Sequence, residues 1–117
     1  MTTFDTGRKA EAAAAAFLVR KGCVIVCQNW RTRMCEIDIV AQRDKIMYFC
    51  EVKYRRTNYY GRGIEYITTK KLRQMRFAAE SWVHAYGWQG EYQLCAIEVS
   101  GPNFKITDVI KDISDTF

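Results

Sequence analysis

The stretch EIDIVAQRDKIMYFCEVKYR, Glu36–Arg55, decides the fold of this 117-residue chain. Residues 36–42 alternate polar and apolar side chains, whereas residues 46–55 are rich in apolar, aromatic and β-branched side chains. Both patterns are typical of β-strands. The sequence therefore predicts two neighbouring strands that form a hairpin in the first half of the chain.

The turn of this hairpin determines which side chains face each other. We expect a two-residue turn at Arg43-Asp44, so that Gln42 pairs with Lys45 and Asp38 faces Phe49. Because side chains alternate across a strand, Asp38 and Glu51 then lie on the same face as diagonal neighbours, about 7–8 Å apart.

Asp38 and Glu51 are both flanked by strongly apolar residues. A carboxylate held among such neighbours is costly unless it is paired or binds a metal, and two carboxylates at this range can share one divalent cation. Lys53 points to the same side, where it could orient a water molecule and offset negative charge on a phosphate. Glu11, on the face of an N-terminal helix that should pack on the sheet, could approach the two acids. The alternative is a solvated charge cluster on an edge strand.

The remaining elements predict a mixed α/β fold in the order α-β-β-β-α-β-β, with a central four- or five-stranded sheet flanked by two helices. A single domain over 1–117 accommodates them. The expected elements are a helix capped by Asp5 or Thr6 and ending near Lys21, a buried strand over 23–30, a loop over 56–67, a helix capped by Thr68 or Thr69 and ending near Tyr86, and strands over 92–99 and 104–109.

Composition excludes several classes of protein. No apolar stretch is long enough to span a membrane, and the N-terminus does not resemble a signal peptide. The five cysteines are scattered among apolar neighbours, which indicates buried thiols in a reducing compartment and not a zinc site. We therefore expect a cytoplasmic protein without a membrane segment.

Charge is unevenly distributed along the chain. Residues 31–76 carry twelve Lys and Arg against five Asp and Glu, whereas residues 77–117 carry two against six. A basic middle part favours a nucleic-acid partner, although a solvated face would give the same pattern. The expected phosphate contacts are Arg31, Arg33, Arg55, Arg56, Arg62, Lys70, Lys71, Arg73 and Arg76. Tyr54, Tyr59, Tyr60 and Tyr66 could stack on unpaired bases or close the core beneath a loop.

Asp38 followed by Glu51-Val52-Lys53 on the next strand resembles the PD-(D/E)XK pattern of restriction-endonuclease-like enzymes. More closely, the chain resembles the YraN-like family of predicted endonucleases, which are distantly similar to archaeal Holliday junction resolvases. The matching positions are Gly7, Glu11, Asn29-Trp30-Arg31, 36–40, 49–55, Tyr60-Gly61, Lys71 and Arg73.

This resemblance implies a restriction-endonuclease-like fold and a nuclease site. In that site Asp38 and Glu51 hold Mg²⁺ or Mn²⁺, Lys53 orients the attacking water and Glu11 supports a metal-bound water. The expected partner is DNA, cut in a branched or flapped structure, and a homodimer would suit a branched substrate. The sequence departs from the family at Ala10 and Cys35, where glycine is usual, and at Gln93-Leu94-Cys95, where Arg-Phe-Asp is usual.

Two rival functions stay open on these residues. A nucleic-acid-binding module without cleavage would keep the basic surface and account for the departures at Cys35 and Cys95. A protein-interaction domain would use its acidic C-terminal part to dock a basic partner, but it leaves the two acids in apolar surroundings without a purpose.

Overall fold

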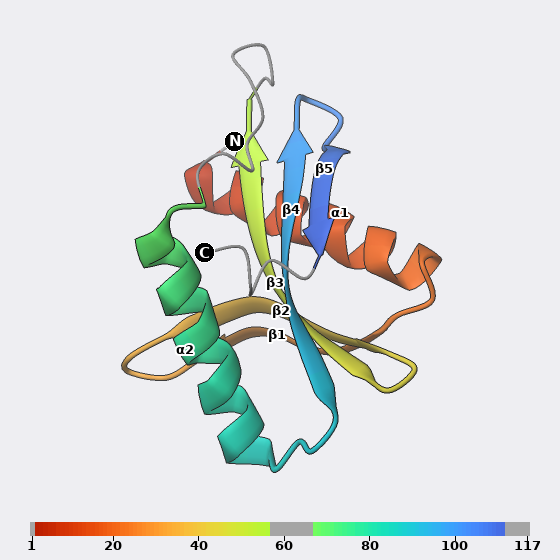
Figure 1. Ribbon diagram of the computed structural model, residues 1–117. Coiled ribbons are helices and arrows are strands. Elements are labelled where there is room, and N and C mark those ends of the chain that lie inside the picture. Colours follow the sequence, from red (N-terminus) through yellow and green to blue (C-terminus); the bar gives the residue numbers. More distant parts are fainter. Residues whose placement is uncertain (1, 57–66, 112–117) are drawn as a thin grey trace.

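Two helices cover opposite faces of a five-stranded sheet in the computed structural model, which describes residues 2–56 and 67–111 (Figure 1). The helices are α1 (Thr3–Arg20) and α2 (Thr69–Tyr86), and the strands are β1 (Val24–Arg31), β2 (Glu36–Arg43), β3 (Ile46–Arg55), β4 (Glu91–Ser100) and β5 (Lys105–Lys111). The strand order is β1-β2-β3-β4-β5, and only β3 and β4 run parallel among the paired strands of the described chain. The predicted α/β class, element order and flanking helices are confirmed.

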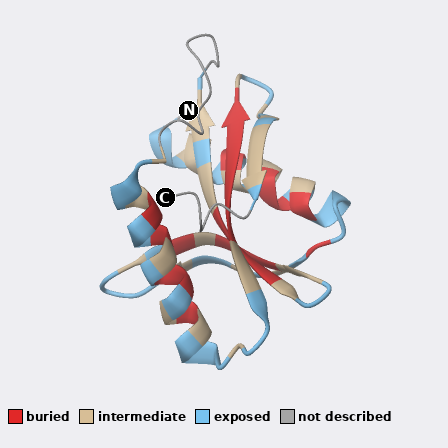
Figure 2. Cartoon of the chain, viewed as in Figure 1, coloured by how far each residue is buried: buried red, intermediate tan, exposed pale blue. Residues whose placement is uncertain are grey.

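The centre of the sheet is buried on both faces because each helix covers one of them. Figure 2 shows β4 as the most continuously buried strand. On the α1 side the core contains Ile39, Cys50 and Ile97, and on the α2 side it contains Phe49 and Leu94. Adjacent residues of one strand thus enter different halves of the core, as the pleat requires.

Helix ends follow local capping chemistry. The Thr2 hydroxyl of α1 accepts a hydrogen bond from the Asp5 amide, and the Asp5 carboxylate accepts one from the Thr2 amide, which forms a capping box. The prediction that Asp5 or Thr6 caps this helix is therefore wrong, because the N-cap is Thr2 and Asp5 is the third residue of the helix. Thr68 caps α2 as expected, and Gly87 ends it with a left-handed backbone conformation (φ 67°).

The turn between β2 and β3 lies one residue later than predicted. Arg43 pairs with Ile46, so Asp44 and Lys45 form the turn, and Phe49 faces Val40 and not Asp38. Asp44 adopts a positive φ of 55°, which aspartate tolerates well. Arg43 stays in the strand and its guanidinium donates to the Lys21 carbonyl at 3.1 Å. The register shifts by two residues, so the faces of the strands are unchanged.

The expectation of a buried first strand is also wrong. β1 is an edge strand, with Val24 68% and Val26 41% exposed. Its apolar composition matches a buried strand, but only one neighbour, β2, pairs with it and α1 covers it only in part.

Some expectations concern residues that the structure does not describe. Most of the loop predicted over 56–67 lies outside the described residues, which resume at Ile67. Across the described chain, neither helix combines the length and apolar character that a membrane crossing requires.

Small side chains set the distance between α1 and the sheet. Ala10 and Ala14 are buried against it, whereas Ala12 on the same helix is exposed. We expect Ala14→Leu to lower the free energy of unfolding by about 1–3 kcal/mol, because extra methylene groups overpack a filled core. Ala12→Leu is the control and should change it by less than about 0.5 kcal/mol. Urea denaturation measures both, and equal effects would contradict this packing.

Candidate functional site

The site begins where β2 separates from β3. The last pair of their ladder is Ile39 with Cys50, and Asp38 is the next residue outward. Asp38 Oδ2 accepts a hydrogen bond from the Val52 amide at 2.8 Å. In a continued ladder that amide would bond to the β2 backbone, so the side chain takes the place of a strand partner. Asp38 is thereby held next to Glu51 at the point where β2 and β3 separate, which we call the fork.

The negative charge of the Asp38 carboxylate is unfavourable in the folded protein. Burial, as the largest cause, and the nearby Glu51 carboxylate raise the pKa of Asp38 from 3.8 to about 7. The Val52 hydrogen bond acts in the opposite direction, while Glu11 and Glu36 contribute smaller upward shifts of the same pKa. Glu11 of α1 is half-buried. It therefore lies near enough to act on Asp38 from the other layer of the fold.

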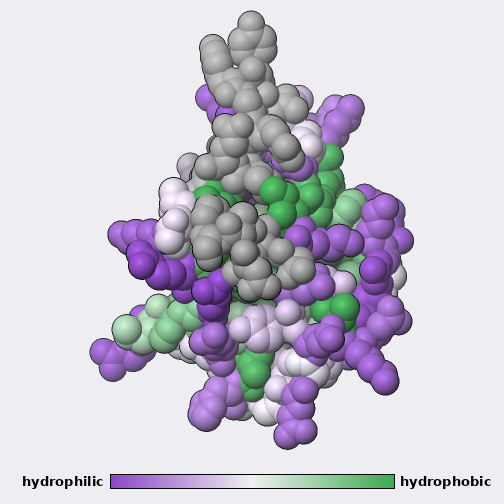
Figure 3. Space-filling view, in the orientation of Figure 1, coloured by the Kyte–Doolittle hydropathy of each residue, from purple (hydrophilic) through white to green (hydrophobic). Residues whose placement is uncertain are grey.

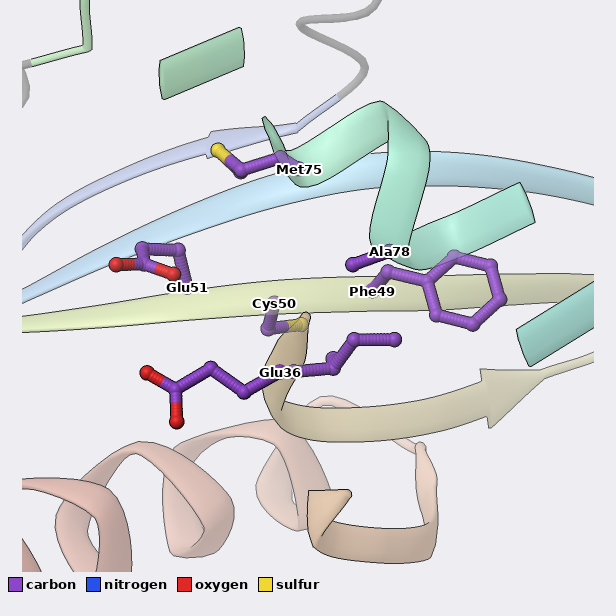
Figure 4. Close-up of a pocket in the computed structure, with 7 residues that line it drawn as sticks. Glu36, Phe49, Cys50, Glu51, Met75 and Ala78 are labelled. Atoms are coloured by element: carbon purple, nitrogen blue, oxygen red, sulfur yellow. The ribbon is translucent and has the colours of Figure 1, made fainter. Parts of the chain in front are cut away.

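Glu51 points to the α2 side of the sheet. Its Oε1 lies 2.8 Å from Lys71 Nζ, an ion pair between β3 and the first turns of α2. Figure 4 shows that the carboxylates of Glu36 and Glu51 point to the same side of a small pocket, away from Phe49 and Ala78. Sequence reasoning assigned Lys71 to a phosphate and did not foresee this pairing.

Lys53 lies two residues beyond Glu51 on the same face of β3, and it is exposed. The structure thus brings Asp38, Glu51 and Lys53 to one end of the β2–β3 pair, with Glu11 approaching from α1. The register was predicted incorrectly by two residues, and Asp38 lies beyond the last pair of the β2–β3 ladder, so the shared face of Asp38 and Glu51 stays a prediction.

Glu98 of β4 is a buried acid that sequence reasoning missed. It is 1% exposed and registers with Lys53 in the parallel pair. Its Oε1 accepts a hydrogen bond from Thr107 at 2.6 Å, and Arg55 Nη1 lies 3.6 Å from Oε2, which is buried without a hydrogen-bond donor in the described chain. The signal was available, because Glu98 interrupts an apolar strand just as Glu51 does.

The basic residues expected to contact phosphate occupy different environments. Arg31 pairs with Glu36 at 3.4 Å on the surface, and Arg55 is drawn to Glu98. Arg76 is only half-exposed, and Arg62 lies outside the described residues. The exposed members of the set are Arg31, Arg33, Arg56, Lys70 and Arg73. Figure 3 shows hydrophilic side chains gathered over the start of α2.

Tyr54 belongs to the core side of the fold. Its hydroxyl donates to the Gly101 carbonyl at 2.9 Å, and its ring packs against Phe104 with centroids 5.1 Å apart. It lies on the α1 face, opposite Glu51. Of the two roles left open, closing the core therefore applies to Tyr54. Tyr59, Tyr60 and Tyr66 lie outside the described residues.

The donor set fits a hard divalent cation held mainly by water. Within the described residues no three His, Cys, Asp or Glu side chains are grouped closely enough to hold a metal ion among themselves. Mg²⁺, however, is usually bound by one or two carboxylates, with water and substrate phosphate as the other ligands. Asp38 and Glu51 supply that number. The raised pKa of Asp38 comes first from burial and then from the Glu51 charge, and a bound cation would stabilise the ionised carboxylate against both.

Comparison with known proteins gives one consistent match. The model of a family described as "Uncharacterised protein family UPF0102" matches residues 10–110. A UPF0102 protein of Cytophaga hutchinsonii is 34% identical over 106 residues, which cover 91% of this chain and 94% of that protein. UPF0102 proteins of Leifsonia xyli subsp. xyli and Desulfosudis oleivorans are 41% and 43% identical, over 71% and 72% of this chain and 70% and 68% of their own lengths.

The raised pKa of Asp38 predicts a pH dependence of stability. The pKa of Asp38 is about 7 in the folded state against an ordinary 3.8. Between these two pH values the folded state therefore keeps a proton that the unfolded state has already released. The free energy of unfolding should therefore fall as pH rises from about 4 to 7, and Asp38→Asn should remove that part of the slope.

Urea titrations at several pH values, with a chelator present, measure this slope. Asp44→Asn, at the exposed hairpin turn, is the control for losing one carboxylate and should keep the wild-type slope. Parallel curves for wild type and Asp38→Asn would contradict the raised pKa.

Removing Glu98 should destabilise the fold. Glu98→Ala leaves the Arg55 guanidinium half-buried beside an empty space and the Thr107 hydroxyl without its acceptor. We expect a loss of about 3 kcal/mol in the free energy of unfolding. Glu91→Ala, an exposed glutamate on the same strand, should change it by less than about 0.5 kcal/mol. Similar losses in the two variants would show that the buried charge is unimportant.

Proposed function

This chain belongs to the UPF0102 family, the YraN-like family that its motifs resemble, and we propose that it is a metal-dependent nuclease that hydrolyses DNA phosphodiester bonds. One observation carries the proposal. Asp38 is held by the Val52 amide in a half-buried position beside Glu51, where its charge is unfavourable. A fold keeps such a carboxylate at a cost in stability, which is typical of functional sites.

Each residue of the site has a distinct role in this proposal. Asp38 and Glu51 hold the cation, with Asp38 oriented by its hydrogen bond to Val52. Lys53, on the same face and exposed to solvent, orients the attacking water and balances negative charge that develops on the phosphate. Glu11 supports a water at the edge of the site. When bound, Mg²⁺ or Mn²⁺ would polarise the phosphate and lower the pKa of water.

Charge around the site supports a nucleic-acid substrate. The exposed cations Lys70 and Arg73 lie on α2 near the Glu51–Lys71 pair, and the first turn of α2 contains no acidic residue. Phosphate contacts of this kind position the backbone without reading the bases. We accordingly propose recognition by structure, in branched or flapped DNA. None of the five cysteines forms a disulfide, which suits a cytoplasmic enzyme.

A second candidate function is nucleic-acid binding without cleavage. The Lys71–Glu51 ion pair favours it, because a lysine at 2.8 Å already neutralises one of the two carboxylates. In the nuclease, Lys71 must release Glu51 when a cation binds, and it is then available to a phosphate. Cleavage in the presence of a divalent cation distinguishes the two functions.

The test is incubation of the full chain with branched, flapped, single-stranded and duplex DNA in Mg²⁺ or Mn²⁺. We expect Asp38→Asn and Lys53→Ala each to lower the cleavage rate about a hundredfold or more. Lys45→Ala, at the exposed hairpin turn, is the matched control and should cut like the wild type.

Melting curves separate the roles of the two residues. Divalent cations should raise the melting temperature of the wild type and of Lys53→Ala, because a ligand that binds only the folded state stabilises it. Asp38→Asn should lose this effect but retain DNA binding. If Asp38→Asn melts and cuts like the wild type in Mn²⁺, Asp38 is an ordinary strand residue and the proposal is wrong.

A further inference from the structure

An open groove of about 540 Å³ leads away from Glu51 between α2 and the loop that joins β1 and β2. On the helix side it is lined by Lys70, Lys71, Arg73, Gln74, Met75 and Phe77. Lys70, Arg73 and Phe77 are spaced three or four apart, so they form a single stripe along α2, about 10 Å long. Met34 and Cys35 line the opposite side. Glu36, Glu51 and Met75 border both this groove and the small pocket of Figure 4, so the two are continuous.

The groove combines cations with two large apolar side chains that face solvent. Met34 is 78% and Phe77 51% exposed, and Lys70 and Arg73 lie on the same stripe as Phe77. Figure 3 shows an apolar projection over the β1–β2 loop, beneath the hydrophilic side chains at the start of α2. Two exposed apolar side chains across one groove are unfavourable in water, and they indicate a ligand with an apolar surface.

Met34 is held outward by a structured turn. The Thr32 hydroxyl accepts hydrogen bonds from the amides of Met34 and Cys35, at 3.0 and 3.1 Å. The Thr32 amide also donates to the Cys35 carbonyl at 2.9 Å. These bonds fix the loop backbone, so Met34 is presented to the groove and cannot easily fold back onto the core.

We propose that this groove binds an unpaired DNA segment next to the cleavage site, an inference that rests on the proposed nuclease function and specifies its substrate. Phosphates of the segment meet Lys70 and Arg73, and its bases pack on Phe77 and Met34. Unpaired bases present the flat π faces that aromatic and thioether side chains contact well. An intact duplex keeps the π faces of its bases stacked, so its phosphates would be desolvated against the two apolar side chains without a compensating stacking contact.

Binding without cleavage tests the groove separately from the nuclease. Fluorescence anisotropy of the full chain, in a chelator, would compare a blunt duplex with the same duplex carrying a single-stranded extension. We expect the wild type to bind the extended duplex more tightly. Phe77→Ala and Met34→Ala should each weaken that binding by about fivefold to a hundredfold and leave blunt-duplex affinity unchanged.

Two further variants show whether the effect is specific to the groove. Phe4→Ala removes another exposed phenylalanine, 71% exposed at the start of α1, and should bind both ligands like the wild type. Lys70→Ala should weaken binding to both ligands and reduce the salt dependence of affinity. Unchanged melting temperatures would exclude misfolding as the cause of any loss.

The outcomes separate the two proposals. Equal affinity for both ligands, or Phe77→Ala and Met34→Ala proteins that bind the extension like the wild type, would overturn the groove proposal even if the protein cleaves DNA. Preference for the extension that the two variants lose, in a protein that cleaves nothing in Mg²⁺ or Mn²⁺, would support the groove and overturn the nuclease.

Discussion

The hydrogen bond from the Val52 amide to Asp38 is the interaction on which the candidate site depends. It lies where the β2–β3 ladder ends, and it replaces a backbone acceptor with a carboxylate. This satisfies a strand amide at the fork, which would otherwise need another acceptor. It also holds the carboxylate in a half-buried position, where burial and the neighbouring Glu51 carboxylate raise its pKa although the hydrogen bond itself lowers it. The separation of two strands and the electrostatics of the site therefore have one physical origin.

The two-layer arrangement of helices determines what surrounds that fork. α1 packs through small alanines on one face and carries Glu11 towards Asp38, while α2 packs on the other face and brings Lys71 to Glu51. Asp38 therefore receives unfavourable charge from α1 and from neighbouring strand residues, whereas Glu51 receives a cation from α2. This asymmetry assigns different properties to two acids that look equivalent in the sequence.

A second set of charges is buried deeper on the same face of the sheet. Glu98, Arg55 and Thr107 connect β3, β4 and β5 beyond the end of the α2-side core. A buried charge pair of this kind adds little net stability compared with apolar packing, but losing one member is costly. The network ties the end of β3, which carries Lys53 and Arg55, to its neighbouring strands and so supports the geometry of the site.

Local chemistry in the sequence determined the secondary structure well. β3 occupies the predicted residues, and Thr68 and Gly87 bound α2 because caps and left-handed glycines act through neighbouring backbone groups. Alternation placed Glu51 and Lys53 on one face of β3, and a register error of two residues could not change that face. The fold class followed from the order of these elements.

Only the tertiary structure decided what depends on distant partners. β1 has the apolar composition of a buried strand, but it lies at the sheet edge and is partly exposed. Burial depends on what covers a strand and not on the composition of the strand alone. Lys71 meets Glu51, Glu98 meets Arg55, and Met34 faces Phe77 across a groove, although the members of each pair lie 20 or more residues apart. Such pairings arise from how the helices and strands pack, because packing brings together side chains that are distant in sequence and that no local pattern relates.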